Sequence, residues 1–191
     1  MPDNIQDIKP MQPSGPLPFT MQEGEAIYAE VKPERTGYIL SNMIGTTIVT
    51  LFIILCFTIT YLITNNSILW DLVIIVVSLA IGLISPLISY GKFKYWITNH
   101  RVVGQRGFIG YSVESIPLEN VTDVTISRGM IEQILGISSL YIVPIGGVMY
   151  GGRAGGGVNY FPALKPDHAV ELQSMLFKLR DARKKEMGKT L

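Results

Sequence analysis

The chain has 191 residues, of which 48% are hydrophobic, and its 16 Lys/Arg and 15 Asp/Glu leave a formal net charge of +1. This near-neutral balance, without a basic run interleaved with aromatic residues, argues against nucleic acid as a partner. The single cysteine, Cys56, excludes an intrachain disulfide.

The first 24 residues are rich in proline and contain no apolar stretch behind a basic start. This composition predicts a disordered N-terminal tail over residues 1–24 and no cleavable signal peptide. Residues 25–37 are expected to form a juxtamembrane segment before the first apolar run.

Two long apolar runs, residues 38–64 and 72–90, contain no charged residue. A helix needs about 20 apolar residues to cross a bilayer, and both runs come close to or exceed that length. Residues 65–71 between them are too few for more than a short outer loop. Their only charge, Asp71, is expected to be hydrated at the membrane interface. The sequence therefore predicts a transmembrane helical hairpin.

The cations near the two runs indicate the orientation of the hairpin. The outer loop has none, whereas candidate membrane-proximal cations stand on the other side: Lys32, Arg35, Lys92, Lys94 and Arg101. An excess of Lys and Arg marks the cytoplasmic side. We therefore expect an integral cell-membrane protein whose termini and soluble domain are both cytoplasmic. Lys92, Lys94 and Arg101 are each expected to add about 1 kcal/mol of attraction to anionic lipid, which is anchoring rather than head-group recognition.

The soluble part, residues 91–187, is predicted to consist of strands followed by one helix. Alternating apolar residues and turn residues indicate about six or seven antiparallel strands in a highly bent sheet. The expected strands are 94–98, 101–106, 111–116, 121–127, 140–145 and 158–161, with a helical turn at 130–135. From Pro166 onward, apolar residues recur at helical spacing: Ala169, Leu172, Met175, Leu176 and Leu179. The last helix is expected to cap the sheet, with its leucines buried.

Several short motifs within roughly residues 25–180 together resemble one known family. They are Tyr95-x-Ile97-Thr98-x-x-Arg101, Gly107, Ile116-Pro117-Leu118-x-x-Val121-x-x-Val124 and Ile131-Glu132-x-x-Leu135-Gly136-Ile137. With the preceding hairpin, they resemble the membrane-flanked bacterial and archaeal pleckstrin-homology-like (PH-like) domain family. The resemblance implies a membrane-anchored α+β fold: a transmembrane hairpin followed by a PH-like antiparallel β-barrel capped by one C-terminal helix. It implies no particular biochemical activity.

No constellation of residues indicates catalysis. The soluble part has two histidines, His100 and His168, and no pair of His, Asp or Glu at metal-ligand spacing; no nucleophile motif is present. We therefore expect no enzyme activity, no catalytic residue, no metal, no cofactor and no small-molecule substrate. The turn at Asn99-His100 is too short to wrap a lipid head group as the long loop of eukaryotic PH domains does.

The glycine-rich segment 146–157 is the most unusual local feature. It is interpreted as a long connection between two strands, as a backbone nest for an anion beside Arg153, or as a partner contact. Met149, Tyr150 and Arg153 are the candidate partner-binding residues, because these residue types are enriched at interfaces.

The sequence thus favours a membrane-tethered PH-like binding or assembly module without catalytic activity. Its expected role is protein–protein interaction at the cytoplasmic face, with an unknown protein partner or as a homo-oligomer. The alternative is a small subunit of a membrane transport or membrane enzyme complex, in which the transmembrane hairpin is the working part.

Overall fold

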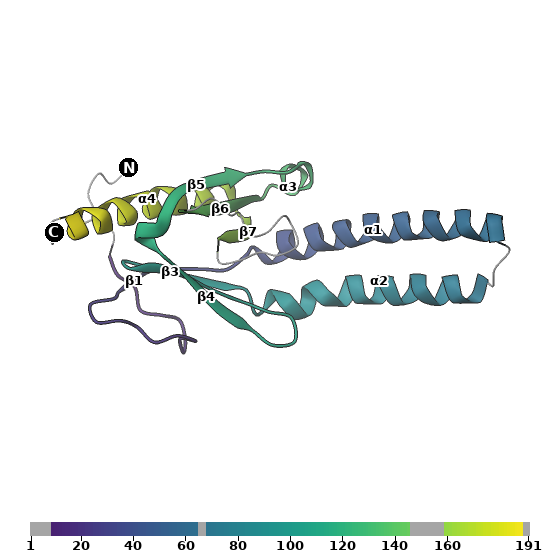
Figure 1. The fold of residues 1–191 in the computed structure, drawn as a ribbon, viewed down its shortest axis with the longest axis horizontal. Coiled ribbons are helices and arrows are strands. Elements are labelled where there is room, and N and C mark those ends of the chain that lie inside the picture. The colour runs from purple at the N-terminus through teal and green to yellow at the C-terminus, as the bar shows by residue number, and fades with distance from the viewer. Residues whose placement is uncertain (1–8, 65–67, 146–158, 189–191) are drawn as a thin grey trace.

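The computed structural model describes residues 9–64, 68–145 and 159–188. A mixed α/β domain forms one end of the molecule, and two long antiparallel helices project from it (Figure 1). The helices are α1 (Arg35–Thr64) and α2 (Ile68–Tyr90). Each helix begins before its expected start. Because α2 begins at Ile68 rather than at residue 72, the break between the helices narrows to residues 65–67, which lie outside the described residues.

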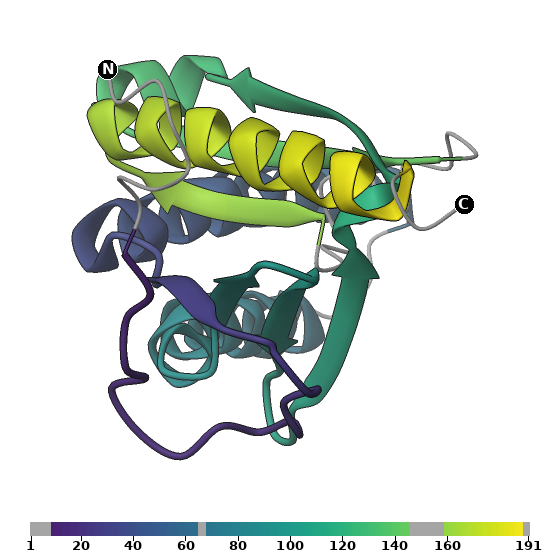
Figure 2. The same ribbon diagram turned by 90° about the vertical axis from the view of Figure 1, so that its left-hand side faces the viewer.

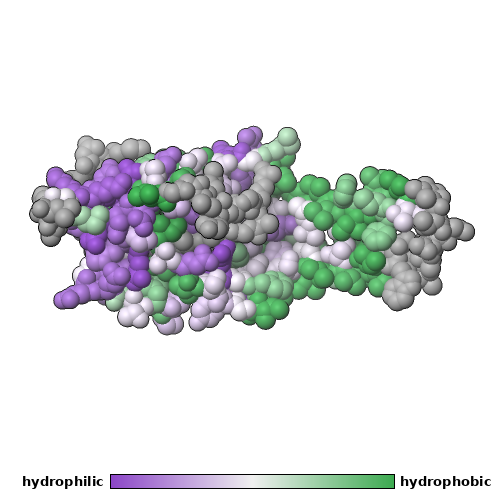
Figure 3. All heavy atoms as spheres, in the orientation of Figure 1, coloured by the Kyte–Doolittle hydropathy of each residue, from purple (hydrophilic) through white to green (hydrophobic). Residues whose placement is uncertain are grey.

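Most of the hairpin surface is apolar and exposed. In the most apolar windows of α1 and α2, only 6% and 11% of the residues are buried inside the protein. Both helices are long and apolar enough to cross a membrane, judged by length and composition. Figure 3 shows a mostly hydrophobic surface along the coloured part of the projecting helices, whereas the domain surface is largely hydrophilic.

The two helices approach each other closely at Gly82. A Cβ atom added at Gly82 of α2 would lie 1.8 Å from Thr46 Cγ2 and 2.8 Å from Thr46 Cβ on α1. Rotating the threonine side chain cannot relieve the second contact, because Cβ does not move with χ1. At Gly45 of α1, by contrast, an added Cβ atom would have no other atom within 4 Å.

This difference predicts opposite effects for two otherwise identical substitutions. Gly82→Ala should destabilise the helix pair by about 1–3 kcal/mol through overpacking. Gly45→Ala should be neutral or stabilising, because alanine is the better helix former. Thermal unfolding of the two full-length variants in the same detergent would measure the difference. Equal midpoints for both variants would contradict the close approach at Gly82.

The strands form two antiparallel sheets. The first sheet has the order β1-β2-β3-β4 and the second has the order β5-β6-β7. Their bounds are β1 (Ile27–Val31), β2 (Lys94–Thr98), β3 (Arg101–Arg106), β4 (Ser112–Pro117), β5 (Val121–Ser127), β6 (Ser138–Pro144) and β7 (Tyr160–Leu164). A 3₁₀ turn, Leu118–Asn120, joins the sheets. The predicted strands are thus confirmed with small shifts, whereas the pairing of the described strands gives two sheets rather than one continuous barrel.

The structure differs from the expected domain organisation at β1. Ile27 and Val31 are buried, and β1 pairs with β2 from Ile27 opposite Thr98 to Val31 opposite Tyr95. The segment 25–37, which we expected to be a juxtamembrane segment, therefore supplies a strand of the domain. The hairpin does not simply precede the domain but is inserted between two neighbouring strands of its first sheet.

Residues 9–24 also differ from the expected disordered tail. Leu17 and Phe19 pack against Ile27, Trp96 and Val103 on the first sheet. The rings of Phe19 and Trp96 meet edge to face, with centroids 5.6 Å apart. The backbone is also paired, since Met11 N donates to Ile27 O at 2.7 Å. The apolar residues among the prolines therefore bind this segment to the sheet.

The C-terminal helix α4 (Pro166–Gly188) covers the core. Figure 2 shows it crossing the domain on the side that faces away from the hairpin. Its buried residues are Ala169, Leu172, Leu176 and Leu179, as the helical spacing predicted. They pack with residues of both sheets, among them Tyr95, Leu140, Ile142 and Phe161. The amphipathic helix thus closes one core shared by the two sheets.

Candidate functional site

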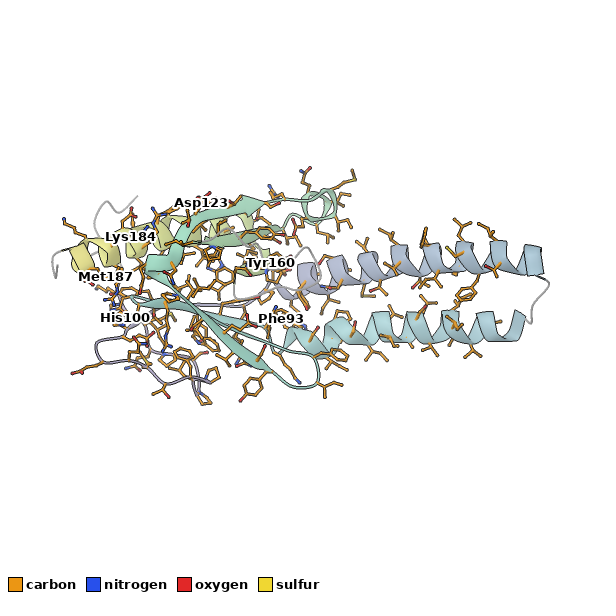
Figure 4. The ribbon with its side chains drawn as sticks, in the orientation of Figure 1. Phe93, His100, Asp123, Tyr160, Lys184 and Met187 are labelled. Atoms are coloured by element: carbon orange, nitrogen blue, oxygen red, sulfur yellow. The ribbon has the colours of Figure 1, made fainter. Side chains whose placement is uncertain are left out.

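The junction between the hairpin and the domain is a packed apolar cluster. Tyr38 of α1 is buried with Ile137 and Ala163 of the domain. Its ring centroid lies 6.0 Å from that of Tyr90 at the end of α2 and 5.3 Å from that of Phe93. Figure 4 labels Phe93 where α2 enters the first sheet. The two helices are therefore fixed to the domain by side chains on both of them.

Backbone contacts reinforce this junction. Glu34 N donates to Ala163 O at 2.7 Å, and Tyr90 Oη donates to Pro33 O at 3.3 Å. Ala163 has φ 52°, in the left-handed region that residues other than glycine seldom adopt. A Cβ atom at Gly37 would lie 2.6 Å from Ile137 Cγ2, so the start of α1 lies directly against the domain. The left-handed Ala163 and the close packing of Gly37 against Ile137 mark a junction without a free linker.

A second cluster surrounds a buried ion pair at the opposite end of the first sheet. Arg101 Nε and Nη2 each donate to Glu25, at 2.9 Å to Oε1 and 2.9 Å to Oε2. The side chain of Glu25 is fully buried, and that of Arg101 is 18% exposed. Arg101 Nη2 also donates to Thr20 O at 2.7 Å, and its guanidinium lies over the Phe19 ring. The pair therefore ties the N-terminal segment to the β2–β3 turn.

Two carboxylates that accept hydrogen bonds from the N-terminal segment, Glu25 and Glu30, have lowered pKa values. Burial raises the pKa of Glu25, but hydrogen bonds from Arg101, Gln22 N and Thr98, with the charge of Arg101, outweigh it and lower the pKa below 4.5. Burial likewise raises the pKa of Glu30, while Ser14 and Lys32 lower it overall. The ionised form of each carboxylate therefore stabilises the folded protein.

A lowered carboxylate pKa predicts acid sensitivity of the N-terminal segment. The stabilisation by Glu25 should be complete above about pH 4.5 and lost as the pH falls through its lower folded-state pKa. Fluorescence of Trp96, which contacts Phe19, should report release of the segment during an acid titration. Glu25→Gln should weaken this step, because only the contribution of Glu30 then remains, and the exposed control Glu23→Gln should keep it. An unchanged titration in Glu25→Gln would contradict the assignment.

Four of the five candidate membrane-proximal cations lie beside the hairpin. Lys32 directly follows β1 and Arg35 begins α1, while Lys92 and Lys94 follow α2. Arg35 is exposed, whereas Lys94 is half-buried in β2. Lys32 pairs with the carboxylate of Glu30 at 3.2 Å. These four cations thus lie within a few residues of the ends of the hairpin helices that adjoin the domain.

The expectation that Arg101 lies close to the membrane is wrong. It begins β3 next to His100, which lies at the end of the domain away from the helices (Figure 4). Because a strand rises about 3.3 Å per residue, β2 carries the chain far from α2 before the turn. Arg101 moreover forms an ion pair with Glu25, a partner that the sequence did not identify. Its role is structural.

The other expected site residues belong to the glycine-rich segment. Met149, Tyr150 and Arg153 fall within residues 146–158, which lie outside the described residues, so their role in partner binding stays a prediction. Within the described ranges, no group of three or more His, Cys, Asp or Glu residues is placed to hold a metal ion.

The comparisons with known proteins give a family. The family model described as "Bacterial PH domain" matches residues 29–180, which include residues 29–31 of β1, the hairpin, the strands β2 to β7 and most of α4. No curated protein and no solved structure matches the chain. The chain therefore belongs to the bacterial PH domain family.

Proposed function

We propose that this protein is an integral membrane protein that presents its PH-like domain as a non-catalytic binding or assembly module at the cytoplasmic face. The observation that supports this proposal is the hairpin itself. It exposes apolar side chains along nearly its whole length and is inserted, without a free linker, between two paired strands. Such a surface requires an apolar environment, and the rigid junction gives the domain a defined position relative to it.

The internal hydrogen bonds of the hairpin favour an anchor over a transport role. Thr46 and Thr47 donate to the carbonyl oxygens of Asn42 and Met43, four residues earlier in the same helix. Thr58 of α1 and Ser89 of α2 follow the same pattern. These hydroxyl groups are satisfied within their own helices rather than directed at a shared polar path. The hairpin as the working part of a transport complex is therefore the weaker alternative.

Cysteine accessibility tests the orientation. In a Cys56→Ser background, Asn66→Cys should react with an impermeant thiol reagent on intact cells, because the cation distribution places residues 65–67 outside. Glu171→Cys on α4 should react only after the membrane is permeabilised. Labelling of the Glu171 position and protection of the Asn66 position in intact cells would reverse the proposed topology.

The binding role is tested by exchanging the hairpin while keeping its junction. Residues 43–85 are replaced by an unrelated two-helix anchor, so that Tyr38 and Tyr90 still pack together. A module should retain its crosslinked partners and its assembly size in detergent, whether the partner is another protein or a second copy. If segment 146–157 is the contact, Tyr150→Ala combined with Arg153→Ala should reduce both the yield of crosslinked partners and the assembly size. Loss of assembly in the exchanged chain alone would favour the working-hairpin alternative.

A further inference from the structure

Two exposed apolar tips flank the base of the hairpin. The β3–β4 loop presents Phe108, Ile109 and Tyr111, which are 43%, 87% and 64% exposed. The short helix α3 (Met130–Ile134) presents Met130 and Ile134, which are 81% and 78% exposed. Figure 3 shows hydrophobic surface at both places, next to the start of the projecting helices. Large apolar side chains are seldom this exposed in pairs on a polar domain.

The loop tip is held against the end of α2. Lys92 Nζ, two residues after α2, donates to Ile109 O at 2.6 Å and lies 3.4 Å from Gly110 O. The loop backbone is thereby fixed toward the protein, while the Ile109 side chain remains exposed. Leu87 and Ile88 in the last turn of α2 are exposed as well.

The α3 tip is held beside the start of α1. Glu132 accepts hydrogen bonds from Gly129 N at 2.7 Å and from Ser139 Oγ at 2.5 Å, which fixes one side of α3 to β6. Leu135 and Ile137, just after α3, pack into the cluster around Tyr38. Met130 and Ile134 therefore point outward from a fixed backbone, on the other side of the hairpin from the loop (Figure 1).

We infer that these two tips rest in the interfacial region of the bilayer, so that the domain contacts lipid at two points beside the hairpin. This inference rests on the proposed membrane function. A bilayer is favoured over a protein partner because the tips lie on opposite sides of the hairpin, level with the ends of its apolar surface. A flat lipid surface around the helices contacts both tips at once. Arg106 and Arg128 adjoin the loop and α3 in the chain. Arg106 Nη2 pairs with Glu114 at 2.7 Å and Arg128 Nε donates to Ile137 O at 3.2 Å, and each guanidinium has further N–H donors for anionic head groups.

Depth-dependent quenching of a thiol-linked fluorophore tests the contact. The full chain is reconstituted in vesicles of phosphatidylcholine and phosphatidylglycerol that carry a nitroxide either near the carbonyl end or near the middle of the acyl chain. Ile109→Cys and Ile134→Cys are labelled separately in a Cys56→Ser background. The matched control is Met187→Cys, an exposed apolar position of α4 at the end away from the hairpin (Figure 4). The native Cys56 of α1, labelled in the wild type, reports insertion of the hairpin.

We expect both tip positions to lose more fluorescence with the shallow nitroxide than with the deep one, and Met187 to lose none. Cys56 should be quenched by the deep nitroxide. If Cys56 is quenched but the tip positions, like Met187, are not, the lipid contact is overturned and the proposed function still stands. If neither nitroxide quenches the tip positions but the protein shields them from aqueous iodide, the tips contact a protein or a second copy of the chain instead, and the lipid contact is overturned. An unquenched Cys56 would overturn both.

Discussion

Replacing Arg101 with methionine is expected to destabilise the domain by about 3–5 kcal/mol, because the substitution leaves the fully buried Glu25 carboxylate without its ionic partner. Methionine retains much of the apolar length of the side chain, so the loss reports the charge together with the hydrogen bond to Thr20 O and the cation–π contact with Phe19. Unfolding followed by Trp96 fluorescence measures the effect, with Trp70→Phe as background so that Trp96 is the only tryptophan.

The control is an ion pair of the same type in an exposed place. Arg106 Nη2 lies 2.7 Å from Glu114 Oε1, but these side chains are 28% and 42% exposed. Arg106→Met should therefore cost only about 0.2–1 kcal/mol. The double variant Glu25→Met with Arg101→Met should recover part of the loss, since no unpaired charge remains buried. A cost for Arg101→Met no greater than that for Arg106→Met would contradict the structural role of the pair.

Leu176→Ala is expected to cost about 2–5 kcal/mol. The side chain is fully buried between α4 and the sheets, so truncation removes apolar contacts and leaves a cavity in the common core. Thermal unfolding of the full chain in detergent, followed by Trp96 fluorescence, measures the loss. Val170→Ala on the same helix is the control, because Val170 is 47% exposed and its truncation should change little. Similar midpoints of thermal unfolding for the two variants would contradict the burial of Leu176 in the common core.

The insertion of the hairpin between β1 and β2 has a mechanical consequence. The chain leaves the first sheet at β1, traverses both helices and returns as the neighbouring strand β2. Tilting the helices therefore strains two paired strands and the Tyr38 cluster together. A domain attached by one flexible linker would lack this coupling. The position of the domain relative to the hairpin is thus set by the fold.

Local sequence patterns were sufficient to predict those helices and strands whose own residues determine their structure. The two apolar runs contain enough residues to form their helices without help from distant parts of the chain. The strands after Tyr90 show alternation and turn residues, and the leucine spacing of α4 identifies its buried face before any partner is known.

Other features were decided only by tertiary structure, because their partners are far away in the chain. The short segment Ile27–Val31 becomes a strand through pairing with β2, which follows it by more than 60 residues. Residues 9–24 are rich in proline, yet Leu17 and Phe19 acquire a binding surface once Trp96 and Val103 lie side by side. Arg101 resembled a membrane-proximal cation in the sequence, and the length of β2 together with the burial of Glu25 gives it a structural role instead. Local patterning determines which elements form, whereas long-range pairing and burial decide which of them share one domain.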